Sequence, residues 1–137
     1  MKLYSRILLL LLFPVLLSAC EKTRYSMDND VNLRYQNPII VISDDAEVEV
    51  EFTKLVEDSR CMGNKMCIWG GRFTGEFLLN GQDKIYLSLG DLRHLAQVPK
   101  HTSDVYQGHT FTLLKAEIEP EDQRKARKYR ITLKVSK

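Results

Sequence analysis

The strongest constraint on the fold is a strict two-residue alternation of apolar and acidic side chains. Residues 47–52 read Glu-Val-Glu-Val-Glu-Phe. Successive side chains of a β-strand point to opposite faces of a sheet, whereas a helix would spread these residues around its circumference. The segment therefore predicts a strand with one buried and one solvated face. Val48, Val50 and Phe52 are its candidate core residues.

The same period recurs along the chain. Phe73, Phe77 and Leu79 share a face, and Gly75 between them indicates a bulge or a close approach of another group. An Asn-Gly pair at residues 80–81 favours a tight hairpin into the next alternating segment. Further apolar patterns indicate strands over residues 39–42, 85–89, 111–118 and 129–135, and a change of phase after Leu113 predicts a bulge.

These patterns predict an all-β protein of six to seven short strands, built as an antiparallel β-sandwich or a flattened barrel. Residues 92–98 are the only candidates for a helical turn, which Pro99 would end. The chain shows no internal repeat and no low-complexity segment.

The N-terminus has the order of a secretory signal. Lys2 and Arg6 precede an apolar run over residues 7–17, which is shorter than the roughly 20 residues needed to cross a bilayer. The sequence Leu17-Ser18-Ala19-Cys20 then resembles the lipobox of bacterial lipoproteins. The resemblance implies a diacylglyceryl group on the Cys20 sulfur and cleavage before that residue, commonly with a third acyl chain. The alternative is an ordinary signal peptide with a chance cysteine.

Cleavage would divide the chain into a signal peptide (1–19), a lipidated polar tether (20–37) and a single β-domain (38–137). The full chain has 20 basic and 18 acidic residues, and the signal peptide carries two of the basic ones, so the mature chain has 18 of each. This balance argues against nucleic acid as a partner. Fully extended, the 17 residues that follow Cys20 in this tether would reach roughly 55 Å.

Assigning Cys20 to lipid leaves Cys61 and Cys67 as an even pair in an oxidising compartment, which predicts a disulfide between them. The competing interpretation is a metal site. It would need further ligands, and the three histidines, His94, His101 and His109, have no tight ligand spacing. We expect neither a metal nor another cofactor.

Residues 56–71 resemble a pattern in small, mostly uncharacterised bacterial lipoproteins, in which Asp-Ser-Arg-Cys-Pro is followed by Cys-x-Trp-Ala-Gly. Met62 stands in place of the proline and Gly70 in place of the alanine. The resemblance implies no particular activity. The matching residues are Asp58, Ser59, Arg60, Cys61, Cys67 and Trp69.

The segment has two interpretations. It could be a structural knot, in which Trp69 packs beside the disulfide and Arg60 pairs with Asp58. It could also be a binding loop formed by Asp58, Ser59, Arg60 and Trp69. No Gly-x-Ser-x-Gly motif supports Ser59 as a nucleophile, and the acids at residues 44–47 do not form a calcium-binding loop. No catalytic residue is therefore assigned.

A basic run precedes the last predicted strand and could face anionic lipid or polysaccharide. Alternatively, it is a solvated guard against edge-to-edge pairing. Its members are Arg124, Lys125, Arg127, Lys128 and Arg130.

Together these features predict a non-enzymatic envelope module, anchored in membrane lipid through Cys20, that binds an envelope protein or glycan or has a structural role. In a Gram-negative source it would lie on the outer membrane facing the periplasm. Two alternatives stay open. One is a secreted protease inhibitor presenting loop 61–67, and the other is an enzyme with an unrecognised site.

Overall fold

The computed structural model describes residues 22–61, 68, 70–90, 101–118 and 129–137. Within these ranges the chain forms nine β-strands and no helix. The strands are β1 (Arg24–Ser26), β2 (Asp30–Arg34), β3 (Ile39–Ile42), β4 (Glu47–Asp58), β5 (Arg72–Leu79), β6 (Asp83–Gly90), β7 (Ser103–Tyr106), β8 (His109–Ile118) and β9 (Tyr129–Ser136).

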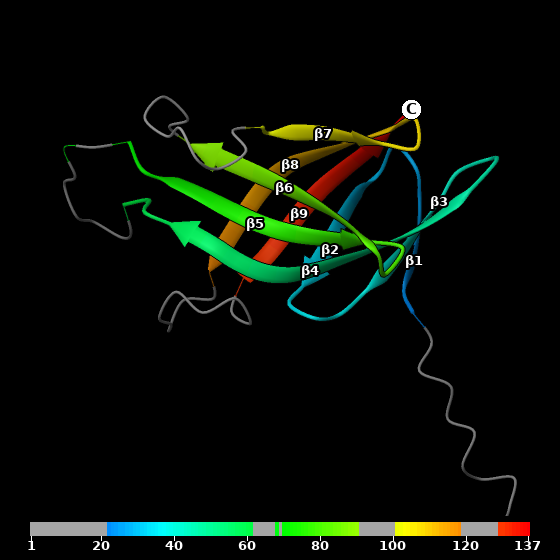
Figure 1. Ribbon diagram of the computed structural model, residues 1–137, viewed down its shortest axis with the longest axis horizontal. Coiled ribbons are helices and arrows are strands. Elements are labelled where there is room, and N and C mark those ends of the chain that lie inside the picture. Colours follow the sequence, from blue (N-terminus) through cyan, green and yellow to red (C-terminus); the bar gives the residue numbers. More distant parts are fainter. Residues whose placement is uncertain (1–21, 62–67, 69, 91–100, 119–128) are drawn as a thin grey trace, which may run out of the picture.

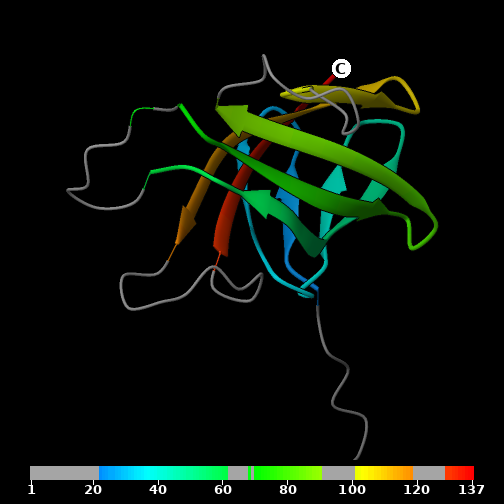
Figure 2. The ribbon, with the colours of Figure 1, turned by 60° about the vertical axis from the view of Figure 1, so that its left-hand side comes forward.

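The strands form two sheets that pack face to face (Figures 1 and 2). The five-stranded sheet has the order β1-β3-β4-β5-β6, and the four-stranded sheet has the order β2-β9-β8-β7. Neighbouring strands are antiparallel except β1 and β3, which are parallel. The predicted fold class is confirmed as a β-sandwich, because the two sheets stay separate rather than forming one sheet closed on itself.

The alternation in β4 has the predicted effect. Val48, Val50 and Phe52 face the interior and are at most 2% exposed, while the three glutamates that alternate with them lie on the outer face. Val50 lies between Ile39 of β3 and Leu79 of β5 in the registers of the two pairings. This strand therefore contributes one complete row to the core.

Two finer predictions are also confirmed. The Asn-Gly pair connects β5 and β6 in a hairpin whose flanking pair is Leu79 and Asp83. Asn80 and Gly81 have positive φ angles of 49° and 68°, a conformation that asparagine and glycine adopt more readily than other residues. In β8 the register against β9 shifts after Leu113, as the change of phase predicts.

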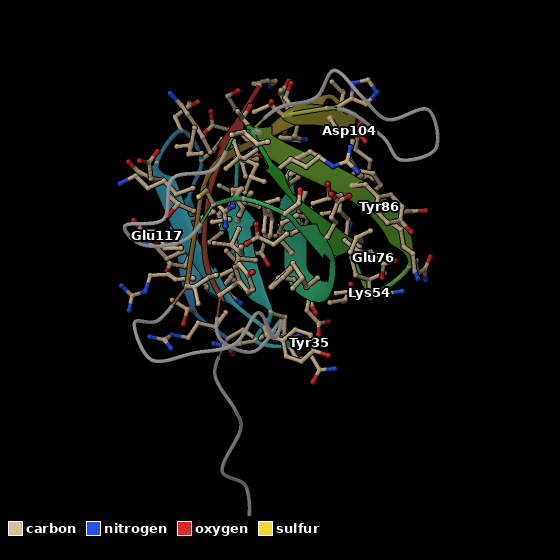
Figure 3. The ribbon with its side chains drawn as sticks, turned by 90° about the vertical axis from the view of Figure 1, so that its left-hand side faces the viewer. Tyr35, Lys54, Glu76, Tyr86, Asp104 and Glu117 are labelled. Carbon is tan, nitrogen blue, oxygen red and sulfur yellow. The ribbon has the colours of Figure 1, made fainter. Side chains whose placement is uncertain are left out.

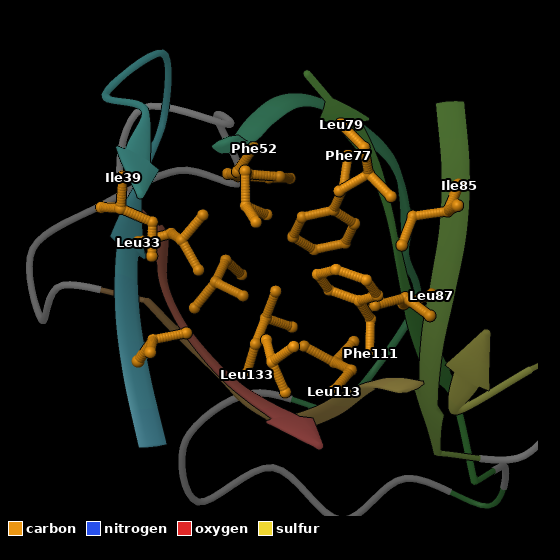
Figure 4. Packing of buried hydrophobic residues seen from close by; sticks show 14 of the residues in the cluster. Leu33, Ile39, Phe52, Phe77, Leu79, Ile85, Leu87, Phe111, Leu113 and Leu133 are labelled. Atoms are coloured by element: carbon orange, nitrogen blue, oxygen red, sulfur yellow. The ribbon is translucent and has the colours of Figure 1, made fainter. Parts of the chain in front are cut away.

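The core fills the space between the sheets with aliphatic side chains and a group of phenylalanines (Figure 4). The rings of Phe52 and Phe77 lie 5.4 Å apart, and Phe52 also contacts Tyr35 at 6.0 Å. Gly75 provides the close approach that its position in the alternation indicates. A Cβ atom at Gly75 would lie 3.0 Å from the Phe52 ring.

The prediction of a flexible tether over residues 20–37 is wrong for the residues that form β1 and β2. β2 pairs with β9 along its whole length, and it buries Val31 and Leu33 to 0% and 1% exposure. Two alternating apolar residues are too short a pattern to stand out within a polar segment. The domain therefore begins before residue 38, and the predicted strand count of six to seven is too low. The predicted helical turn at 92–98 lies outside the described residues.

Several strand ends meet at one end of the sandwich, on the left in Figure 1. The last residue of β4, Asp58, is paired with Phe73 of β5, and Arg72 is paired with Gly90 at the end of β6. Tyr129 begins β9 in the other sheet and lies within hydrogen-bonding distance of Asp58. This end holds the Asp-Ser-Arg segment.

Candidate functional site

The Asp-Ser-Arg segment starts where the chain leaves β4. The side chain of Asp58 faces inward and has no exposed surface. Its carboxylate accepts hydrogen bonds from Nε and Nη2 of Arg60, each at 2.9 Å, and from the Arg60 backbone N–H at 3.1 Å. A bidentate arrangement of this kind holds both planar groups in one orientation.

A further donor to Asp58 comes from the opposite sheet. Tyr129 donates its hydroxyl to Asp58 Oδ2 at 2.6 Å, and its ring lies 5.2 Å from that of Phe73. The guanidinium of Arg60 lies 5.3 Å from the centre of the same Phe73 ring. Asp58 therefore connects the two sheets at this end of the sandwich.

Opposing effects act on the ionisation of Asp58. Burial raises its pKa, but the hydrogen bonds from Arg60 and Tyr129 outweigh burial and lower the pKa below its ordinary value. The hydrogen bond to Asp58 raises the pKa of Arg60. Both groups are therefore charged at neutral pH, and removing either would leave a poorly compensated charge in a buried setting.

A second ion pair lies on the outer face beside the first. Arg72 is 1% exposed although it points away from the core, and its Nε and Nη2 both donate to Glu57 Oε2. The hydrogen bond from Arg72 lowers the pKa of Glu57. Ser59 closes the group, because its hydroxyl donates to Glu57 Oε1 at 3.0 Å and accepts from the Arg72 backbone N–H at 3.1 Å.

Two glycines allow the chain to pack closely here. A Cβ atom at Gly71 would lie 2.2 Å from the Ser59 carbonyl oxygen, and one at Gly90 would lie 2.4 Å from the Gly71 carbonyl oxygen. Gly90 also has a φ of 105°, which side-chain-bearing residues rarely adopt. Steric crowding by the Ser59 backbone therefore explains why the recognised pattern ends in glycine at position 71.

These contacts support the structural interpretation of Asp58, Ser59 and Arg60. Ser59 has a carboxylate as its neighbour, but Arg72 holds Glu57 ionised with a lowered pKa, which makes it a weak base at neutral pH. A binding role for this loop stays a prediction, because Trp69 lies outside the described residues. Sequence reasoning missed Glu57 and Arg72, since outward-facing charges in a strand normally indicate solvent exposure.

The outer face of the five-stranded sheet carries another polar group (Figure 3). Glu76 is 8% exposed and accepts hydrogen bonds from Tyr86 at 2.8 Å and Thr53 at 3.0 Å. Burial raises the pKa of Glu76, and these contacts together with Lys84 lower it below its ordinary value. Every carboxylate oxygen has a partner, so the group stabilises the sheet without presenting a site.

A groove of about 690 Å³ opens on the opposite side of the molecule. It is lined by residues of β1, β2, β8 and β9 and by the start of β3. Its charged members are three basic and two acidic residues, a net charge of +1 from the lining. They are Arg34, Lys115 and Arg130, with Asp30 and Glu117.

The centre of the groove has an unusual arrangement of charge. Arg34 of β2 and Arg130 of β9 are direct cross-strand partners, and both are exposed. Like charges in this position ordinarily destabilise a sheet. Glu117 of β8 is paired with Arg130 on its other side. Uncharged hydrogen-bonding side chains, Asn32 and Thr132, form the next cross-strand pair.

Sequence reasoning found only Arg130 of this groove, as the last member of the basic run. The other members of the run, Arg124, Lys125, Arg127 and Lys128, lie outside the described residues. Arg34 was missed because its strand was assigned to the tether. The sequence signal for that strand is weak, because only Val31 and Leu33 alternate with polar residues over 30–34.

The remaining predicted residues are placed in part. Cys20, Cys67 and His94 lie outside the described residues, and Cys61 is exposed just after β4, so the disulfide stays a prediction. His109 is buried, and its Nε2 lies 3.4 Å from Ser43 Oγ. Within the described ranges, no three His, Cys, Asp or Glu side chains gather as a metal site would require.

The same ranges contain no helix of the length and apolar character needed to cross a membrane. Comparison of the chain with models of protein families, with curated proteins and with solved structures finds no match in any of the three.

Proposed function

We propose that the chain is a non-enzymatic binding module of the bacterial cell envelope, held on a membrane by lipid on Cys20, and that the groove is its binding site. The groove is the observation that supports this proposal best. It combines about 690 Å³ of space with paired arginines and neutral hydrogen-bonding groups, as recognition of a polar ligand requires.

The contacts of the N-terminal residues would place the domain close to such an anchor. Lys22 pairs with Glu49, and Arg24 pairs with Glu47. These contacts fix the first described residues on β4, immediately after the proposed lipidated cysteine. Lipid with two or more acyl chains would hold such a domain stably on a bilayer.

A serine substitution at position 20 tests the anchor. We expect Cys20→Ser to abolish incorporation of labelled palmitate and to leave the uncleaved precursor, because the lipid-specific peptidase acts on the modified chain. Labelled palmitate and immunoblotting of membrane fractions measure the two effects. Cys61→Ser is the matched control and should be labelled and cleaved normally. Normal cleavage of the Cys20→Ser chain would refute the lipobox assignment.

The protease-inhibitor alternative keeps one observation in its favour. Ile68 follows loop 61–67 directly and is a large apolar side chain that is 97% exposed. Residues 62–67 lie outside the described ranges, so the alternative stays a prediction. It would be excluded if envelope proteases kept full activity in the presence of a large excess of the protein.

A further inference from the structure

A backbone hydrogen bond of Thr23 lies very close in the chain to the proposed lipid attachment point. The carbonyl of Thr23 accepts a hydrogen bond from the Ile40 N–H at 2.9 Å, so Thr23 is already fixed against β3. Three residue steps separate Thr23 from Cys20, and they span at most about 11 Å when fully extended. Lipid on Cys20 would therefore hold this part of the domain against the membrane surface.

Thr23 is also one of the residues that line the groove. The lipid anchor and the groove thus lie on the same part of the molecule, and the groove would open within reach of the lipid headgroups. A 17-residue tether would have allowed the groove to face any direction. The strands β1 and β2 remove that freedom, because both belong to the sandwich.

The charges in the groove suit a phosphate. Arg34 and Arg130 lie side by side across the β2–β9 pairing, and a guanidinium donates two parallel hydrogen bonds to phosphate oxygens. Lys115 adds a third positive charge, and it lies opposite Thr132 where β8 bulges.

We propose that the groove binds the anionic phosphate headgroups of the membrane lipids in which the protein is anchored. This inference rests on the proposed lipidation of Cys20. The closeness of Thr23 to the bilayer favours lipid over an acidic glycan, which would have no reason to lie next to the anchor. The groove would then act as a second membrane contact that sets the orientation of the domain.

Hydrogen–deuterium exchange of the lipidated protein in nanodiscs tests the proposal. One set of nanodiscs contains phosphatidylcholine alone, and the other contains 30% phosphatidylglycerol. Each basic residue near an anionic membrane contributes roughly a fivefold effect on binding. We expect amide exchange in the edge strand β2 to slow at least fivefold with phosphatidylglycerol. Exchange in β7, the opposite edge of the same sheet, should not change.

Two double variants separate the groove from general charge. Combining Arg34→Gln with Arg130→Gln should abolish the difference in β2 amide exchange between the two sets of nanodiscs. Lys54→Gln with Lys84→Gln removes the same charge from the outer face of the other sheet and should preserve it. Lys54 and Glu117, which lines the groove, lie on opposite sides of the molecule (Figure 3). Equal loss in both double variants would overturn the proposal.

Further outcomes identify the source of the anion. If soluble glycerol phosphate slowed amide exchange in β2 as much as phosphatidylglycerol does, the membrane would not be the partner. The same conclusion would follow if an acidic oligosaccharide slowed this exchange and phosphatidylglycerol did not. Intact mass spectrometry establishes acylation before reconstitution. A chain without acyl mass would refute the proposed anchor, whereas an acylated chain with no lipid-dependent exchange would refute the headgroup site alone.

Discussion

Replacing Asp58 by alanine is expected to destabilise the folded protein by about 3–5 kcal/mol, the usual cost of breaking a buried ion pair. The substitution removes the acceptor of the Arg60 guanidinium and of the Tyr129 hydroxyl. The guanidinium and the buried hydroxyl therefore lose these hydrogen bonds at the junction of the two sheets. Urea denaturation followed by circular dichroism measures the change in the free energy of unfolding.

The effect of this substitution should depend on pH. The pKa of Asp58 is lower in the folded protein than in the unfolded chain, where it is about 4. Its stabilising contribution is therefore present above pH 4 and is lost as the pH falls below that value towards the folded pKa. The difference in stability between wild type and Asp58→Ala should be full at pH 7 and shrink as the pH falls below 4.

An exposed aspartate provides the matched control. Asp45 pairs with Lys137 and its side chain is 62% exposed, so Asp45→Ala should leave the urea midpoint at pH 7 unchanged. If Asp58→Ala and Asp45→Ala had the same stability, the connecting role of Asp58 would be wrong.

Substituting glutamate for Val50 should prevent folding at neutral pH. Val50 has no exposed surface and lies in the middle of β4 between two neighbouring strands. An unpaired charge there costs several kcal/mol, which is a large part of the roughly 5–15 kcal/mol that stabilises a domain. Circular dichroism should show loss of the β-spectrum.

The adjacent residue in the same strand is the control for Val50. Glu49 faces outward and pairs with Lys22, and the two side chains are 31% and 41% exposed. Glu49→Gln should therefore cost less than about 1 kcal/mol. A folded, cooperative Val50→Glu protein would contradict the assignment of the inner face of β4.

The sequence predicts strands well where three or more apolar residues alternate. β4 and β9 are examples, and their inward residues are all buried at their predicted positions. The change of phase in β8 even located a bulge. β2 has only Val31 and Leu33 for the same signal, and it is stabilised by its pairing with β9, about 100 residues away. Such a pairing leaves no local trace in the sequence.

The candidate sites were harder to predict for the same reason. The partners of Asp58 include Tyr129, which is 71 residues away and in the other sheet. Arg72 points outward yet is buried, so a period-two pattern misplaces it. The groove depends on strands β1 and β2, and a segment interpreted as a tether could not contribute a site. The local sequence pattern therefore predicted the sheets of the fold. The candidate sites could not be predicted in this way, because long-range strand pairings bring their residues together.

The corrected N-terminal boundary changes how the proposed lipoprotein would sit on its membrane. A long tether would let the domain sample a volume far from the bilayer, whereas the fixed position of Thr23 limits it to the surface. Partners would then have to approach a domain of defined orientation. The polar groove would face the headgroups, and the Asp58 end of the sandwich would stay free of that contact.

Intact mass spectrometry of the protein extracted from its own membranes tests this account most directly. Free thiols are alkylated first, and no reductant is used. We predict a chain that begins at Cys20, carries the mass of a diacylglyceryl group with or without a third acyl chain, and has no alkylated cysteine. A chain that lacks acyl mass, or that begins at another residue, would contradict the account.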